Sequence, residues 1–272
     1  MTDLILTGAS RGIGRALALA LAEDENPPRM LLIARDAERL ASLVGTLRAR
    51  GVDAQAQVGD LGGLDAARAL GRTARTWVRP GALLVHNAGV WPSHRTLTED
   101  GLEQAFVTNC AGPLTMQAEL LDPPSSLARV LVIGAGLMVR GRVDAERTPT
   151  GRDFSSFRTY CDTKLAFAVA QRELARLHPE LDVLVLHPGV VRTELGARGG
   201  LLGWVLERVK RRWEDPADCA ARLSRLLSHE GRWSPPGSAA FRVVERDTAW
   251  PPVAEAGATL DALPGLLAYA RR

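Results

Sequence analysis

Two residue types that are rare in this chain stand four positions apart, at Tyr160 and Lys164. The whole sequence holds only two tyrosines and two lysines. On a helix, residues four positions apart lie on the same face. An ammonium group beside a phenol favours the phenolate and lowers the tyrosine pKa from about 10. The spacing therefore predicts a tyrosine that acts as a general acid or base near neutral pH; an exposed helix with two unrelated polar residues is the alternative.

A glycine-rich turn follows the first apolar stretch of the chain. Residues 3–7 are expected to form a short strand and residues 15–22 a helix, with Gly8, Gly12 and Gly14 between them. Glycines allow backbone N–H groups to approach a pyrophosphate, which then lies at the positive end of the helix. The order of strand, turn and helix predicts a dinucleotide-binding site. A tight strand-to-helix loop without a ligand is the alternative interpretation.

Strand and helix patterns alternate along the rest of the chain. Further strands are expected at residues 30–34, 54–58, 82–86, 130–133, 183–187 and 241–244. Helices are expected at residues 37–50, 64–78, 102–121, 159–177 and 216–227. Repeated β–α units predict an α/β fold of the Rossmann type, a doubly wound parallel sheet with helices on both faces. Because no linker or internal repeat divides the chain, residues 1–272 are expected to form a single NAD(P)-binding domain.

Four more segments carry patterns that accompany such a site. They are Asp60-Leu61, His86-Asn87-Ala88-Gly89, the segment 107–112 around Asn109, and the segment 187–193, which begins His187-Pro188-Gly189. Together with the glycine turn and the Tyr160–Lys164 pair, they resemble the short-chain dehydrogenase/reductase family over nearly the whole chain. Residues 160–166, 172–175 and 187–195 further resemble its retinol dehydrogenase and WW-domain oxidoreductase branch.

The resemblance implies which residues contact a nicotinamide cofactor. These are Gly8, Ser10, Arg11, Gly12, Ile13, Gly14, Asp60, Leu61, Asn87, Ala88, Gly89, Tyr160, Lys164, Pro188, Gly189, Val191 and Thr193. In the family, the acidic-hydrophobic pair contacts adenine and the Pro-Gly turn borders the nicotinamide. The family also implies assembly as a homodimer or homotetramer.

The resemblance further implies hydride transfer between the nicotinamide and a small-molecule carbonyl or alcohol. Tyr160 would protonate the carbonyl oxygen, and Lys164 would lower the tyrosine pKa and hold the nicotinamide ribose. Asn109 would keep a water that relays protons toward Lys164. These three residues are the predicted catalytic residues, while the hydride chemistry belongs to the cofactor.

Charge near the end of the second expected strand predicts which cofactor binds. NAD-dependent proteins usually place an acid there for the ribose hydroxyls, but this chain has Ala34. Arg35 follows it and Arg11 lies in the glycine turn, so two guanidinium groups can hold a 2′-phosphate through charge-assisted bonds. Asp36 comes late for the ribose and is expected to cap the next helix. We therefore expect NADP(H).

The chain departs from the family pattern after its fifth expected strand. The family has a Ser-Ser pair there, whose second member binds the substrate carbonyl, whereas this chain has Gly134 and Ala135. Ser155 and Ser156, in the loop before Tyr160, either replace the hydroxyl or only cap the following helix. One lost hydrogen bond to a developing oxyanion costs about 3 kcal/mol. Three interpretations follow: catalysis by Tyr160 with a water or one of these serines, a substrate that carries its own polar group, or a cofactor-binding sensor without catalysis.

Composition and charge narrow the functional classes. The net charge of +3 and the pI near 9.0 come from 34 basic residues spread among 31 acids, so nucleic-acid binding is not expected. Three distant cysteines predict no disulfide or metal site and fit a reducing cytoplasm. No apolar run reaches the roughly 18 residues that span a bilayer. Because a strand is expected to begin at residue 3, no signal peptide is expected. Residues 195–213, apolar with four glycines, are expected to form a lid over a lipophilic substrate, or else to pack against the domain or a second subunit.

Overall fold

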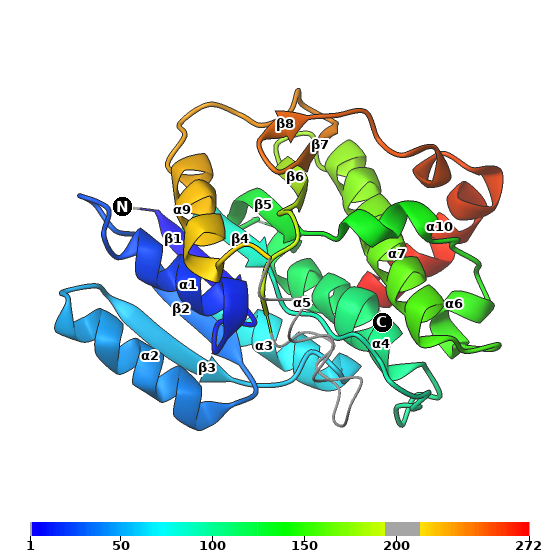
Figure 1. The fold of residues 1–272 in the computed structure, drawn as a ribbon, viewed down its shortest axis with the longest axis horizontal. Coiled ribbons are helices and arrows are strands. Elements are labelled where there is room, and N and C mark those ends of the chain that lie inside the picture. Colours follow the sequence, from blue (N-terminus) through cyan, green and yellow to red (C-terminus); the bar gives the residue numbers. More distant parts are fainter. Residues whose placement is uncertain (1, 124, 194–212, 272) are drawn as a thin grey trace.

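The computed structural model of the chain describes residues 2–123, 125–193 and 213–271 (Figure 1). Within these ranges one sheet contains β1 (Asp3–Thr7), β2 (Arg29–Ala34), β3 (Ala54–Val58), β4 (Ala82–His86), β5 (Leu127–Ile133), β6 (Asp182–His187), β7 (Ala239–Val243) and β8 (Arg246–Asp247). The strand order is β3-β2-β1-β4-β5-β6-β7-β8. All neighbours up to β7 pair in parallel, and only β8 runs antiparallel. The expected doubly wound parallel sheet is confirmed.

Helices cover both faces of this sheet (Figure 1). One face carries α1 (Gly12–Leu21), α2 (Ala37–Ala49) and α9 (Pro216–Leu227); the other carries α3 (Leu64–Trp77), α5 (Gly112–Leu121), α7 (Ser156–Leu177) and α10 (Gly257–Arg271). Because side chains alternate along a strand, Leu4 and Leu6 pack toward α1 while Ile5 packs into the opposite core. Burial on both faces explains why the strands are nearly continuous apolar runs.

The direction in which strands are added reverses between β1 and β4, which are neighbours in the sheet. Successive crossovers from this point pack on opposite faces, which leaves a crevice at the carboxyl ends of the two strands. The glycine turn follows β1 and the 87–89 segment follows β4, so the fold brings these two predicted cofactor segments to the same crevice.

Most expected elements are present, with boundaries that differ by a few residues. β1, β3, β4 and α9 begin and end where the sequence predicts. The helix expected at 102–121 is instead divided into α4 (Gln104–Phe106), a π-helical turn η1 (Val107–Ala111) and α5. α7 begins at Ser156, three residues before the expected start.

Several elements have no counterpart in the sequence analysis. They are η2 (Gly136–Arg140) and α6 (Arg147–Thr150) after β5, and β8, η3 (Pro252–Ala254) and α10 near the C-terminus. α10 packs against α5 and α7. At this contact Thr115 Oγ1 donates to the Tyr269 carbonyl oxygen at 2.9 Å, and the rings of Phe106 and Tyr269 meet edge to face. Pro264 lies inside α10, and a proline argues against a helix when only the sequence is read.

The lid predicted at 195–213 falls, except for Trp213, outside the described residues. In the part of the chain that the structure describes, no helix is both long enough and apolar enough to cross a membrane.

Candidate active site

The glycine turn after β1 permits close backbone approach. Gly8 and Gly12 have φ angles of +67° and +53°, in the left-handed region that favours glycine. A Cβ atom at Gly14 would lie 2.4 Å from the Gly8 carbonyl oxygen, so no larger residue fits there. α1 begins at Gly12, and its N-cap residue Arg11 makes no side-chain cap hydrogen bond. The first N–H groups of α1 thus lack a side-chain cap, an arrangement suited to binding a pyrophosphate.

The segment after β4 holds this turn in place. Asn87 Nδ2 donates to the carbonyl oxygens of Thr7 and Gly8, at 3.0 and 3.1 Å. Thr7 Oγ1 accepts from the backbone N–H groups of Asn87 and Ala88, at 3.0 and 3.1 Å. A Cβ atom at Gly8 would lie 2.9 Å from Ala88 Cα. Asn87 therefore supports the predicted cofactor cradle by fixing its backbone.

The Pro188–Gly189 turn after β6 is anchored to α9. Gly189 has a φ angle of +98°. The Pro188 carbonyl oxygen accepts from Arg222 Nη2 at 2.9 Å, and Arg222 forms a salt bridge with Glu214. The turn is thus held by Arg222 of α9, which is paired with Glu214 just before that helix.

The remaining predicted cofactor residues of this region lie around the glycine turn. A Cβ atom at Gly12 would lie 3.3 Å from Thr193 Cγ2, so the segment after β6 reaches the turn after β1. Val191 is buried, and Ile13 packs on the same apolar core. Ser10 is partly exposed within the turn.

The predicted adenine and ribose contacts lie at the ends of β2 and β3. Arg35 Nη1 is 3.5 Å from Asp60 Oδ2, and both side chains are about half exposed. Leu61, beside Asp60, is buried. Asp36 Oδ1 accepts from the Arg39 N–H at 3.0 Å and caps α2 as expected. Asp36, the acid nearest to the end of β2, therefore caps α2. Arg35 is the charged side chain next to Ala34.

Tyr160 and Lys164 lie on α7 and are both buried, with exposures of 5% and 8%. Lys164 Nζ donates to the Ile133 carbonyl oxygen at 3.2 Å. Burial lowers the pKa of Lys164 to about 8. A Cβ atom at Gly89 would lie 3.1 Å from Lys164 Nζ, so the ammonium group approaches the segment after β4.

The expected lowering of the Tyr160 pKa is wrong for this structure. Burial, with a smaller contribution from Cys161, raises the pKa of Tyr160 to about 12. The physical reason is that desolvation penalises the phenolate, while the hydrogen bond of Lys164 Nζ goes to Ile133. The same-face placement expected for an i, i+4 pair therefore does not lower the phenol pKa.

Asn109 lies in the π-helical turn η1, a feature that is frequent at functional sites. Its Oδ1 accepts from the Val90 N–H at 2.8 Å, and its Nδ2 donates to the Val90 carbonyl oxygen at 2.9 Å. Nδ2 also contacts Thr163 Oγ1 at 3.1 Å. A Cβ atom at Gly89 would lie 3.3 Å from Oδ1. Asn109 thus connects the loop after β4 to α7, beside Lys164.

The expected site of the missing serine carries no hydroxyl group. Ala135 is the second residue after β5 and is buried. Ser155 occupies the N-cap position of α7 but makes no side-chain cap hydrogen bond, so the expected capping role is not observed. Ser156 Oγ accepts from Trp91 Nε1 at 3.0 Å and donates to the Pro92 carbonyl oxygen. Ser156 is therefore engaged by the loop after β4.

Two ring contacts near these residues were not predicted from the sequence. The Trp91 ring stacks on the Tyr160 ring, with centroids 4.3 Å apart and 6° between the planes. The His187 ring packs on Gly136, where a Cβ atom would lie 2.6 Å from Nε2. A tryptophan two residues after Gly89 was a usable signal, whereas no pattern indicated that the His187 ring, at the start of the predicted segment 187–193, packs on Gly136.

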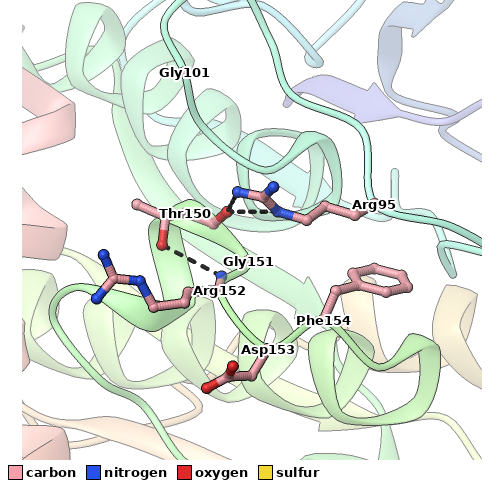
Figure 2. A pocket seen from close by; sticks show the side chains of 7 residues that line it. All are labelled: Arg95, Gly101, Thr150, Gly151, Arg152, Asp153 and Phe154. Carbon is pink, nitrogen blue, oxygen red and sulfur yellow. Dashed lines mark hydrogen bonds between the residues drawn. The ribbon is translucent and has the colours of Figure 1, made fainter.

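An open hollow of about 480 Å³ lies beside the start of α7 (Figure 2). It is lined by Arg95, Gly101, Thr150, Gly151, Arg152, Asp153 and Phe154. Figure 2 shows Arg95 donating to the Thr150 carbonyl oxygen, at 3.1 Å from Nε and 2.8 Å from Nη2. None of the predicted catalytic residues lines this hollow.

The fold and this arrangement define a class of protein. A doubly wound parallel sheet with a glycine turn at its switch point is the fold of dinucleotide-binding proteins, and the buried Tyr–Lys pair lies over the same strand ends. The chain belongs to the short chain dehydrogenase family, whose profile matches residues 3–199. It resembles the retinol dehydrogenases within that family.

Two curated relatives illustrate the match. Retinol dehydrogenase 13 of Homo sapiens is 31% identical over 207 residues, which cover 74% of this chain and 62% of the relative. Retinol dehydrogenase 14 of Mus musculus is 32% identical over 209 residues, covering 71% and 62%. The chain thus spans less than two thirds of the length of these relatives.

A solved structure agrees with the fold. A short chain dehydrogenase from Burkholderia cenocepacia J2315, in complex with NADP, has a TM-score of 0.65 and 25% sequence identity. The match covers 89% of this chain and 96% of that protein.

Proposed function

We propose that this protein transfers hydride between NADPH and a small carbonyl or alcohol compound. The observation that carries the proposal is the meeting of Lys164 Nζ, Gly89 and Asn109 at the strand ends that hold the glycine turn. A Tyr–Lys pair with only a structural role would not need to lie beside Gly89 and Asn109. Tyr160 stands one helical turn before Lys164, which places a proton donor at the same edge.

The preference for NADPH is supported by charge. Arg35 lies beside Ala34, where an acid would serve NAD, and Asp36 is used as the α2 cap. Arg35 pairs only loosely with Asp60, at 3.5 Å and half exposed, so exchanging that partner for a phosphate costs little. The related Burkholderia dehydrogenase was solved with NADP.

The residues present fit such a cofactor. Gly8 and Gly14 pack against neighbouring protein atoms with no room for a side chain, which keeps the turn compact at the start of α1, where a diphosphate would bind. When bound, the cofactor supplies a hydride to the carbonyl carbon. All proton handling then belongs to this chain.

Tyr160 acts as the general acid. Its pKa of about 12 keeps the hydroxyl protonated at neutral pH, so it can donate to the carbonyl oxygen as the carbon is reduced. Lys164, with a pKa of about 8, is largely charged at pH 7, and we assign to it the binding of the nicotinamide ribose. Asn109 holds the Val90 backbone, and we assign to it the water that would return a proton from solvent. The reverse sequence oxidises an alcohol.

Ala135 sets a limit on this chemistry. No hydroxyl at that position polarises the carbonyl, and Ser156 is engaged by Trp91 and Pro92. We therefore assign the polarising role to Tyr160 alone, aided by water or by a polar group of the substrate. The same observation favours one other function, an NADP(H)-binding sensor without catalysis.

Replacing Tyr160 by phenylalanine tests the choice between these functions. Tyr160→Phe removes one hydroxyl, so NADPH affinity and melting temperature should stay close to those of the wild type. The kcat for a carbonyl substrate should fall by about 10² or more. A panel of aldehydes, ketones, quinones and alcohols that gives no turnover, while NADPH still binds, would establish the sensor. Full activity in Tyr160→Phe would refute the assigned mechanism.

Two further predictions concern the protein as a whole. We propose a single domain that works in the cytoplasm as a homodimer or homotetramer. Light scattering on the purified protein tests the assembly, and a mass equal to one chain of 29.2 kDa contradicts it.

A further inference from the structure

Three aromatic side chains meet at the start of α7. Trp91, in the loop after β4, lies parallel to Tyr160 with ring centroids 4.3 Å apart. Phe157, one helical turn before Tyr160, is tilted against Trp91 at 6.3 Å. Trp91 therefore lies across two rings of the same helix face, one of which is the predicted proton donor.

Hydrogen bonds fix the orientation of the indole ring. Trp91 Nε1 donates to Ser156 Oγ at 3.0 Å, and Ser156 Oγ donates to the Pro92 carbonyl oxygen. Ser156, which is itself bound to the Pro92 carbonyl oxygen, thus holds the edge of the indole ring. A ring that is held at its edge and stacked on one face presents a defined flat surface.

This aromatic cluster runs from the interior to the surface. Tyr160 is only 5% exposed, whereas Phe157 is 47% exposed. Phe157 packs on the ring that stacks on Tyr160, and its exposed part offers aromatic surface of the kind that lines ligand sites. The chain has only two tyrosines, six tryptophans and five phenylalanines, so three aromatic rings at this place are a marked local concentration.

At the same place, two positions that could offer a hydroxyl group to a substrate do not do so. Ala135 offers no hydroxyl, and the Ser156 hydroxyl is occupied by Trp91 and Pro92. Orientation of the carbonyl must then depend more on apolar contact. Aromatic rings favour offset-stacked or edge-to-face partners, beyond the gain from buried area. A flat ring can contact such a surface over its whole face, whereas a puckered saturated ring contacts it only through some of its hydrogens.

We propose that Trp91 is a specificity-determining residue that selects carbonyl compounds whose carbonyl is attached to a planar aromatic ring. This inference rests on the proposed carbonyl chemistry at Tyr160. Phe157 forms the outer part of the same recognition surface, and Ser156 is a positioning residue that acts through Trp91.

Acetophenone and cyclohexyl methyl ketone test the proposal, because they share a carbon skeleton and differ in planarity. Dissociation constants for both are measured by ligand-observed NMR on the enzyme saturated with NADP⁺, so the result does not depend on turnover. Wild type should bind the aromatic ketone more tightly. The ratio of the two constants should shrink about three- to tenfold in Trp91→Leu and be largely kept in Trp91→Phe.

Trp250→Leu is the matched control. Trp250 donates from Nε1 to the Ala239 carbonyl oxygen at 2.9 Å and packs on Phe241, away from the cluster, so its loss should leave the ratio unchanged. Ser156→Ala should give an intermediate ratio, because the indole loses its hydrogen-bond acceptor. Where turnover is measurable, the ratio of kcat/KM for the two ketones should change in parallel, since intrinsic reactivity cancels between variants.

The outcomes separate this inference from the proposed function. An equal ratio in wild type and Trp91→Leu, or no binding of either ketone, overturns the role of Trp91. Carbonyl turnover that depends on Tyr160 but shows no aromatic preference overturns Trp91 and leaves the proposed function standing. Selective binding without any carbonyl turnover supports Trp91 as the recognition residue and refutes the reductase.

Discussion

Lys164 Nζ donates a hydrogen bond to the Ile133 carbonyl oxygen at 3.2 Å, which ties α7 to the last residue of β5. The ammonium group is buried there, and burial is the cause of its lowered pKa of about 8. A single main-chain acceptor does not compensate for the water that the charge has lost. Because the charge is buried, the free energy of unfolding depends on pH in the range where Lys164 titrates.

Lys164→Met should reveal that pH dependence. The pKa of Lys164 is about 8 in the folded protein against an ordinary value of 10.5, so between these values the unfolded chain binds more protons. Wild-type stability should therefore rise with pH in this window relative to Lys164→Met, by up to about 3 kcal/mol. Urea unfolding of both proteins from pH 7 to pH 10 measures the difference. A difference that is constant, or that moves the other way, would contradict the lowered pKa.

Arg35→Asp should change the cofactor preference. Wild type should bind NADPH more tightly than NADH, and the substitution should narrow or reverse that preference by about tenfold or more, because a charge-assisted bond to the 2′-phosphate is lost. Fluorescence titration with both cofactors gives the ratio. Arg72→Asp, the same charge change at an exposed position of α3, serves as the control. Equal binding of both cofactors by the wild type would rule out the predicted role of Arg35.

Ala135→Ser should raise the rate of carbonyl reduction by about tenfold or more, since it restores a donor to the developing oxyanion. The measurement is kcat on an activated ketone with NADPH. Ser155→Ala is the matched control, because the Ser155 side chain makes no cap hydrogen bond and should not affect the rate. An Ala135→Ser variant that folds and binds NADPH, yet gains nothing, would place the carbonyl elsewhere.

Gly14→Ala should disrupt the cofactor cradle. The added methyl group would lie 2.4 Å from the Gly8 carbonyl oxygen, so the turn must shift, at a cost of about 1–3 kcal/mol of stability. NADPH affinity should fall with it. Gly45→Ala, in the middle of α2 with no atom within 4 Å of the new Cβ, should instead stabilise the protein by about 0.5–1 kcal/mol. Thermal unfolding and NADPH titration of the two variants make the comparison, and similar results for both would reject the close approach.

Much of the fold could be predicted from the sequence because the strands are buried on both faces. The apolar runs at 3–7 and 82–86 allow few other structures. Residues 54–58 instead alternate alanine and glutamine, and all three observed strands have the predicted bounds. The glycine turn and the Tyr160–Lys164 pair carry strong local signals of type and spacing. The order of these signals along the chain then suffices to predict the edge of the sheet at which they meet.

The features that could not be predicted depend on tertiary contacts. α10 contains Pro264 and is stabilised by packing on α5 and α7, which no local pattern records. The direction of the Tyr160 pKa shift follows from burial beneath Trp91, and the spacing to Lys164 carries no information about that burial. The sequence could not predict whether Ser155 or Ser156 replaces the missing hydroxyl, because that depends on the hydrogen-bond partners of each serine in the folded protein.

The π-helical turn η1 also constrains the length of the chain at this point. It adds one residue to a helical path, and each residue turns a helix by about 100°. Asn109, inside this turn, binds the loop after β4, while Thr115, which follows the turn in α5, meets Tyr269 of α10. Deleting one residue from η1 would rotate one of these contacts away from its partner, whichever side moved. Evolution should therefore accept amino-acid exchanges between Phe106 and Gly112 more readily than a change in the number of residues.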